Sequence, residues 1–241
     1  MRPPAEAPLP PQAVILAFEG VLAPPGVLRD TLEPHSLEAL PGFLERHATS
    51  PAVQRTLSDI LAYSGRELDV DGMLAQIRAW IRGGQDITPV RQLQGMVWAD
   101  ALEAGELQPQ LSATTAATVQ HLHRAGVALY SFGATPAPVQ RDWLRHGPHP
   151  DAEPCLSGLF DTRIGGRRDA GSYRRLAEEI GHAPETVLVL STRTDELDAA
   201  RQAWLLTGFP APQHPDTAPH PVRPLNTLVP ATTADRQGLI D

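Results

Sequence analysis

Residues able to do chemistry follow three apolar runs of the sequence, at the point where each run ends. Glu19 comes directly after the run at residues 14–18, Ser131 and Gly133 end the second run, and Thr192 follows the third. Parallel sheets bind ligands outside the carboxyl ends of their strands. We therefore expect these three segments to share one crevice.

A cation completes this set. A guanidinium such as that of Arg167, together with a hydroxyl and backbone N–H groups, holds a phosphate without any metal. The family resemblance that the motifs below carry brings Arg167 to the same site, and it implies Ser131, Phe132, Gly133 and Arg167 as the phosphate-binding positions. Phe132 leaves two interpretations open, because its ring either lines a ligand site or packs into that space as core.

The three runs have the composition of buried parallel strands. They lie within residues 14–17, 127–135 and 186–194 and are nearly continuous in apolar residues. Helical patterns that stop at Gly126 and Gly181 precede the second and third runs. The alternation predicts an α/β fold with a doubly wound parallel sheet.

A long insertion separates the first two runs. Residues 28–111 contain repeated helical signals and no convincing strand, which predicts an all-helical cap. Ser50 followed by Pro51 marks one helix start, Met73 lies in a second amphipathic pattern, and Thr88 followed by proline opens a third helix. We expect three helices to bundle over the crevice.

Composition narrows the classes of function. The chain has 241 residues, 41% of them hydrophobic, which suffices for one full domain plus an insertion. A net charge of −8, with arginine as the only strongly basic residue, disfavours nucleic acid and anionic membranes as partners. Cys155 is the single cysteine, and no apolar run approaches the roughly 20 residues of a membrane helix. We expect a cytoplasmic protein.

The order of these segments predicts the domain boundaries. Residues 1–12 contain five prolines and are expected to form a flexible arm. The α/β core is expected at 13–27 and 112–207, with the cap at 28–111 between its two parts. A proline-rich tail follows at 208–241. The segment between Ala200 and Trp204 is several residues shorter than in the family that the chain resembles, so the last strand region is expected to be damaged or mobile.

In its motifs the chain resembles the enolase-phosphatases (acireductone synthases) of methionine salvage, members of the haloacid dehalogenase superfamily. The family's Asp-x-Glu-Gly-Thr turn aligns on Glu19 and Gly20, and its Ser-Ser-Gly-Ser motif aligns on residues 131–134. The lysine of Ile-Gly-x-Lys falls on Arg167, and the aspartate of Leu-Ser-Asp falls on Thr192. Residues 88–107 and 157–165 also resemble family segments.

The resemblance implies a haloacid dehalogenase-like core, and it also implies that the reaction is lost. The family's nucleophilic aspartate falls on Ala17, whose methyl group cannot attack phosphorus. The family's magnesium aspartate becomes Thr192, and the one carboxylate left in the first motif, Glu19, is a poor magnesium site. No catalytic position is therefore intact among Ala17, Glu19, Ser131, Arg167 and Thr192, and neither a bound metal nor another cofactor is expected.

Three functions remain open at this point. The first is an inactive homologue that binds a phosphorylated small molecule or a protein partner. The second is an active magnesium-dependent phosphatase or enolase that acts on a phosphorylated diketone with substitute residues, for example Glu19 as a base. The third is a structural or regulatory subunit.

Asp195 is not expected to replace the lost metal ligand, because Thr192 and Asp195 have the spacing of a helix capping box.

Overall fold

The computed structural model describes residues 11–85, 87–210, 220–224 and 228. The chain forms two compact units, one of residues 1–25 with 110–241 and the other of residues 26–109. Nearly all of the predicted arm and most of the predicted tail lie outside the described residues. In the part of the chain that the structure describes, no helix is long and apolar enough to cross a membrane.

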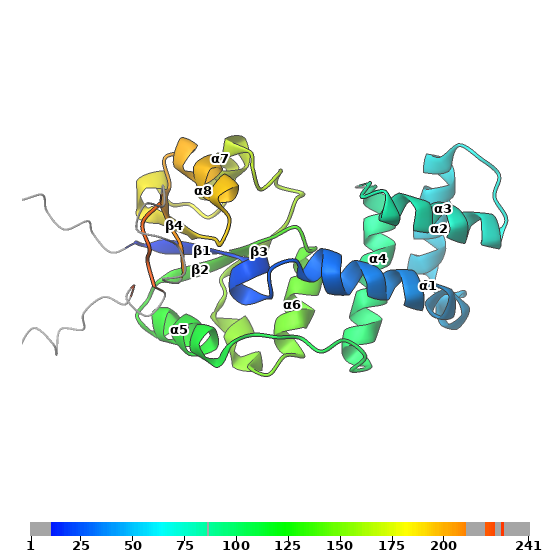
Figure 1. Ribbon diagram of the computed structural model, residues 1–241, viewed down its shortest axis with the longest axis horizontal. Helices are drawn as coiled ribbons and strands as arrows, with labels where there is room; N and C mark the ends of the chain where they lie inside the picture. The colour runs from blue at the N-terminus through cyan, green and yellow to red at the C-terminus, as the bar shows by residue number, and fades with distance from the viewer. Residues whose placement is uncertain (1–10, 86, 211–219, 225–227, 229–241) are drawn as a thin grey trace, which may run out of the picture. The chain divides into compact units, whose positions relative to one another are not determined.

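A five-stranded parallel sheet forms the centre of the first unit, with the strand order β3-β2-β1-β4-β5 (Figure 1). The strands are β1 (Ala13–Ala17), β2 (Ala128–Phe132), β3 (Gly158–Phe160), β4 (Val187–Leu190) and β5 (Leu206–Gly208). All residues of β1 and β4 are buried, which explains their unbroken apolar sequence. The predicted doubly wound parallel sheet is confirmed.

Helices cover both faces of this sheet. In Figure 1, α5 and α6 lie on one face and α7 and α8 on the other. Their bounds are α5 (Ala113–Arg124), α6 (Ala137–Arg145), α7 (Ala170–Glu179) and α8 (Thr194–Gln202), with short helices η1 (Phe18–Leu22), η3 (Pro150–Cys155) and η4 (Pro184–Thr186) in the connections. Apolar residues of α7 and α8 share one core cluster with Ile15 of β1 and Val189 of β4.

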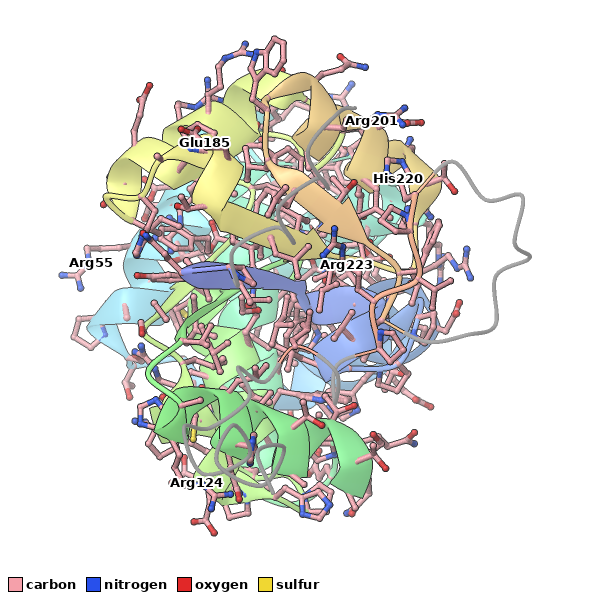
Figure 2. The ribbon with its side chains drawn as sticks, turned by 90° about the vertical axis from the view of Figure 1, so that its left-hand side faces the viewer. Arg55, Arg124, Glu185, Arg201, His220 and Arg223 are labelled. Carbon is pink, nitrogen blue, oxygen red and sulfur yellow. The ribbon has the colours of Figure 1, made fainter. Side chains whose placement is uncertain are left out.

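The expectation of a damaged last strand is wrong for residues 206–208. Leu206 pairs with Leu188 of β4, so β5 completes the sheet. A short segment of the tail lies against this strand: the Phe209 N–H donates to the Pro221 carbonyl at 3.0 Å. His220, whose side chain is fully buried, is hydrogen-bonded to Thr207 at 2.8 Å (Figure 2). The burial of Phe209 and His220 helps to stabilise this strand of three residues.

Helices are the only regular secondary structure among the described residues of the second unit. It contains η2 (Leu28–Leu32), α1 (Glu33–His47), α2 (Pro51–Ser64), α3 (Val70–Arg82) and α4 (Thr88–Glu103). The three expected helices are α2, α3 and α4. The sequence patterns missed α1, which carries Pro41 in its interior, a residue that normally ends a helix. Leu40 and Phe43 of α1 pack in the same core as Ile60 and Ile77, and this burial offsets the cost of the proline.

Polar groups buried in this unit are paired. The Trp98 indole Nε1 donates to the Leu32 carbonyl at 2.6 Å, and Gln94 Nε2 donates to Ser36 Oγ at 3.1 Å. Trp98 and Gln94 belong to α4, Ser36 belongs to α1, and Leu32 directly precedes α1. Directional bonds of this kind fix the register of two helices that apolar packing alone leaves free to slide.

A tight turn follows β1 and positions the first of the chemical residues. Gly20 has φ +99°, its N–H donates to the Ala23 carbonyl at 2.7 Å, and the Ala23 N–H donates to the Phe18 carbonyl at 2.8 Å. A Cβ atom at Gly20 would collide with the Thr192 hydroxyl. The turn therefore requires glycine both for its backbone conformation and for the close approach of Thr192.

We predict that Gly20→Ala lowers the free energy of unfolding by at least about 1 kcal/mol more than Gly126→Ala does. Gly126 also has a positive φ, +82°, but a Cβ there meets nothing within 4 Å, so its replacement costs backbone strain alone. Urea unfolding of the two variants measures the difference. Equal losses would show that Thr192 moves away from the turn at little cost.

Candidate functional site

The carboxyl ends of β1, β2 and β4 meet, as the sequence predicts. Ala17 pairs with Phe132 of β2, and its neighbour Leu16 pairs with Leu190 of β4. The side chain at the end of β1 is thus a methyl group, in a residue that is only 4% exposed. Glu19 follows two residues later in the chain, and Thr192 lies two residues past Leu190 of the neighbouring strand.

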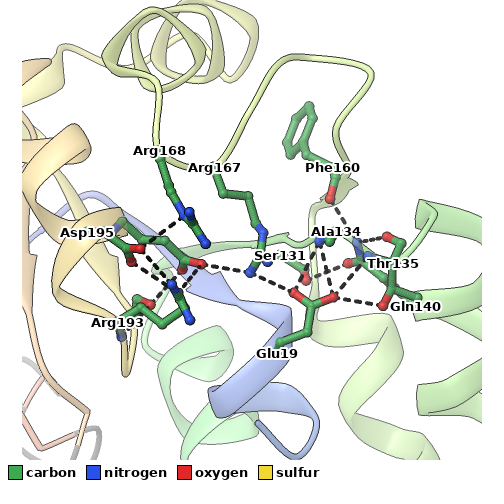
Figure 3. Close-up of polar contacts among 12 residues, drawn as sticks. Glu19, Ser131, Ala134, Thr135, Gln140, Phe160, Arg167, Arg168, Arg193 and Asp195 are labelled. Atoms are coloured by element: carbon green, nitrogen blue, oxygen red, sulfur yellow. Dashed lines mark hydrogen bonds and ion pairs between the residues drawn. The ribbon is translucent and has the colours of Figure 1, made fainter. Parts of the chain in front are cut away.

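The Glu19 carboxylate is held by donors from the loop after β2 (Figure 3). Its side chain is 8% exposed. The Ala134 N–H lies 3.1 Å from each carboxylate oxygen, and Oε1 also accepts from the Thr135 N–H at 2.9 Å and from the Thr135 hydroxyl at 2.8 Å. Arg167 Nη1 donates to Oε2 at 3.2 Å. Each of these groups donates a hydrogen bond to a carboxylate oxygen of Glu19.

The same nitrogen of Arg167 reaches a second buried carboxylate. Nη1 lies 2.7 Å from Glu196 Oε1, and Glu196 is 2% exposed. The Ser191 hydroxyl donates to the other Glu196 oxygen at 2.7 Å, and Arg193 Nε lies 3.5 Å from Oε1. The Tyr173 hydroxyl donates to the Arg167 backbone carbonyl at 3.0 Å and fixes the loop that carries the guanidinium.

Further charges continue this network toward the surface. Asp195 binds Arg193 at 2.6 Å and Arg168 at 3.0 Å (Figure 3). Together with Glu19, Arg167 and Glu196 these residues form a chain of three acids and three arginines in alternating order. The formal charges of these six residues cancel.

The predicted capping box at the start of α8 is wrong. The helix begins at Thr194, its N-cap residue is Arg193, and no side chain caps it. The Asp195 carboxylate instead forms ion pairs with two arginines of the network, Arg193 and Arg168. The hydroxyl of Thr192 lies against Gly20.

Three of the predicted phosphate-binding positions are engaged by the protein itself. The buried Ser131 hydroxyl donates to Gln140 Oε1 at 2.7 Å. The Gly133 N–H donates to the Phe160 carbonyl at 3.1 Å. Phe132 is 2% exposed, and its ring meets the ring of Tyr173 edge-to-face at 5.6 Å, in the core. Only Arg167, of the four predicted positions, points its polar group at Glu19.

Sequence reasoning missed two residues that organise this site. Thr135 supplies both a backbone and a hydroxyl donor to Glu19, and the Gln140 amide donates to the carbonyls of Thr135 at 2.7 Å and Phe160 at 2.8 Å. Gln140 is fully buried on a short amphipathic helix. The sequence feature that could have identified Gln140 is its position as a single amide on the apolar face of this helix. A buried polar group needs hydrogen-bond partners, so such a residue indicates a polar contact in the core.

Burial dominates the electrostatics of Glu196. Removal from water raises the pKa of this carboxyl above its usual range, against the opposing effects of Arg167 and the Ser191 hydroxyl. The pKa of the Asp195 carboxyl, which lies nearer the surface, is instead lowered by the hydrogen bond from Arg193. Burial also raises the pKa of the Tyr173 phenol, which therefore stays a neutral donor to Arg167.

The residues present do not fit a magnesium ion. Magnesium requires near-octahedral oxygen ligands, usually including one or two carboxylates. Ala17 offers a methyl group, and both buried carboxylates, Glu19 and Glu196, are already bound to the Arg167 guanidinium. Among the described residues no group of three or more His, Cys, Asp or Glu side chains could hold a metal.

We predict that Glu196→Gln becomes more stable relative to the unmodified protein as pH rises. The raised pKa means that the folded state keeps the Glu196 proton to higher pH than the unfolded state does, so ionisation costs stability above about pH 4.5. Each unit of pKa difference corresponds to about 1.36 kcal/mol. Urea unfolding between pH 5 and 8 measures the trend, and a pH-independent difference would contradict it.

Comparison with known proteins identifies relatives along most of the chain. No family model matches. The enolase-phosphatase E1 of Thioalkalivibrio sulfidiphilus is 34% identical over 211 residues, which cover 87% of this chain and 94% of that protein. The enolase-phosphatase E1 of Aquifex aeolicus is 30% identical over 194 residues, covering 80% of this chain and 87% of that protein.

Solved structures show the same fold. The UTR4 protein of Saccharomyces cerevisiae superposes with a TM-score of 0.75 at 21% identity, over 88% of this chain and 97% of that one. CbbY of Rhodobacter sphaeroides, solved in complex with phosphate, gives 0.51 at 16% identity, over 87% and 92% of the two chains. The sheet order, the helical insertion and above all the curated relatives lead to one conclusion: this chain belongs to the enolase-phosphatase family of the haloacid dehalogenase superfamily.

Proposed function

We propose that this chain is a non-catalytic member of its family that acts by binding a ligand. The observation that carries the proposal is the methyl group of Ala17 at the end of β1, the position on which the family's nucleophilic aspartate falls. Without a nucleophile, no covalent phosphoryl intermediate forms. The replacement of the second family aspartate by Thr192 supports the same interpretation.

The remaining carboxylates are poorly placed to take over. A carboxylate has about four lone-pair sites, and the two oxygens of Glu19 accept five contacts from four donors. Glu196 is buried behind Arg167 and bonded to Ser191. Attack on a substrate or removal of its proton by Glu19 would first break these bonds.

The ligand class we favour is a phosphorylated small molecule, with a protein partner as the second possibility. Arg167 is the support for the first, because its side chain is 22% exposed and its guanidinium can bind a phosphoryl oxygen. We expect the protein to act in the cytoplasm. Its one thiol, that of Cys155, is buried in the protein and donates to the Asp151 carbonyl.

An active enzyme is the alternative. Its support is the similarity to enolase-phosphatases over 87% of the chain, together with the presence of Glu19 and Glu196 in one site. It requires a magnesium-dependent phosphatase or enolase reaction on a phosphorylated diketone with Glu19 as the base. A structural or regulatory subunit is the further alternative, and it predicts neither turnover nor ligand binding.

We predict no magnesium-dependent turnover of phosphate esters by the unmodified protein. Loss of a covalent nucleophile costs turnover on the order of a million-fold in triad hydrolases, which brings a comparable enzyme to background. Phosphate release from a panel of small esters and phosphorylated ketones measures the rate. The enolase-phosphatase of Aquifex aeolicus, assayed beside it, is the positive control.

A matched pair of variants tests the reason for inactivity. Ala17→Asp with Thr192→Asp restores both family carboxylates, and Ala17→Asn with Thr192→Asn adds the same volume without charge. Turnover by the aspartate pair alone would identify the missing carboxylates as the cause. Metal-dependent turnover by the unmodified chain, lost in Glu19→Gln, would instead overturn the proposal in favour of the active enzyme.

A further inference from the structure

We infer that Glu19 is a built-in occupant of an anion-binding cradle, which it closes to free phosphate. The cradle consists of the Ala134 N–H, the Thr135 N–H and hydroxyl, and the Arg167 guanidinium. This inference rests on the proposed non-catalytic role, and it names the class of ligand that the site takes: an oxyanion, either phosphate or carboxylate.

The donors converge on one place from two separate segments of the chain. Ala134 and Thr135 lie in the loop after β2, and Arg167 lies in the loop before α7. All four donor groups lie within 3.2 Å of a Glu19 oxygen. Two backbone N–H groups, a hydroxyl and a guanidinium match the oxygens of a tetrahedral anion as well as those of a carboxylate.

The cradle is held in shape without help from Glu19. Thr135 is fully buried, and its carbonyl accepts a hydrogen bond from the Gln140 amide at 2.7 Å. The same amide donates to the Phe160 carbonyl, and its oxygen accepts from Ser131. On the other side, the Tyr173 hydroxyl holds the Arg167 backbone. Removal of the Glu19 side chain therefore leaves the donors of Ala134 and Thr135 in place but unpaired, while Arg167 keeps its ion pair with Glu196.

Tethering gives Glu19 the advantage over free anions. A ligand joined to its site by a short linker behaves as if present at millimolar or higher concentration. Glu19 lies two residues after β1, in a turn that backbone hydrogen bonds close. Glu196 remains on Arg167 and repels a second negative charge. A phosphorylated ligand must therefore offer contacts beyond its phosphate to displace Glu19, whereas inorganic phosphate alone fails.

We predict that Glu19→Ala creates a phosphate site. Its thermal midpoint lies below that of the unmodified protein in phosphate-free buffer, because buried donors are left unpaired. Inorganic phosphate well above its dissociation constant then raises the midpoint of this variant by at least about 2 °C. The midpoint of the unmodified protein stays unchanged under the same conditions, and ³¹P NMR line broadening by the variant alone provides an independent measurement.

Two further variants isolate the cradle. Glu153→Ala removes a carboxylate that binds Arg141 at 3.0 Å and Arg145 at 3.4 Å, and we expect no phosphate response from it, because its partners are exposed guanidinium groups only. Glu19→Ala combined with Arg167→Gln removes the cation of the cradle, and the phosphate response is expected to disappear.

Glu19→Gln covers the case in which the alanine variant is too unstable to purify. It keeps the side-chain volume and loses the charge, so we expect a smaller positive response to phosphate. A phosphate response of the unmodified protein equal to that of Glu19→Ala would overturn the inference. Glu19 variants that fold but do not respond to phosphate would also overturn it. Variants that fail to fold even in phosphate would overturn it as well, because the cradle would then depend on Glu19 for its structure.

These results are separable from the proposed function. Turnover by the unmodified protein tests catalysis and requires no variant of Glu19. Phosphate binding by Glu19→Ala tests the cradle and requires no turnover. An active enzyme with a phosphate-binding variant would refute the first proposal alone, and an inactive protein whose variants ignore phosphate would refute the second alone.

Discussion

One guanidinium, that of Arg167, lies between two buried carboxylates, and the rest of the site is arranged around it. Two adjacent carboxylates in a buried crevice repel each other and lose hydration, which destabilises a fold unless a cation and further donors compensate. Arg167 supplies the charge to both Glu19 and Glu196, and backbone N–H groups and hydroxyls satisfy the remaining oxygen lone pairs. Both carboxylates are thereby paired by groups of the protein itself.

The sheet makes this arrangement possible. Parallel strands bring the loops after β1, β2 and β4 to one edge, so residues that are more than a hundred positions apart in sequence share a hydrogen bond, as Glu19 and Thr135 do. Gly20 lets the first loop turn tightly against Thr192, and Gly133 lets the second approach Glu19. A Cβ atom at Gly133 would collide with the Glu19 carboxylate, and one at Gly20 would collide with the Thr192 hydroxyl.

Much of this organisation was predictable from local patterns. The strands ending near Ala17 and Ser131 are apolar runs with clear stops, and the family motifs located the site. The partners within the site were not predictable, because they depend on three-dimensional distances: Ser131 binds Gln140 rather than a ligand, and Phe132 packs in the core. Helix α1 was missed because local rules treat Pro41 as a breaker, whereas burial of the helix outweighs its cost.

The chain has the fold of its family, and in its site Arg167 joins Glu19 and Glu196 in an internal ion-pair network. We propose that Glu19 lies where an anion would otherwise bind. The most direct test is a crystal structure of the unmodified protein grown with magnesium and phosphate. We predict that Glu19 remains on Thr135 and Arg167, with no magnesium beside Ala17 and no phosphate in the cradle. A magnesium ion bound at the end of β1, or phosphate in place of the Glu19 carboxylate, would contradict this account.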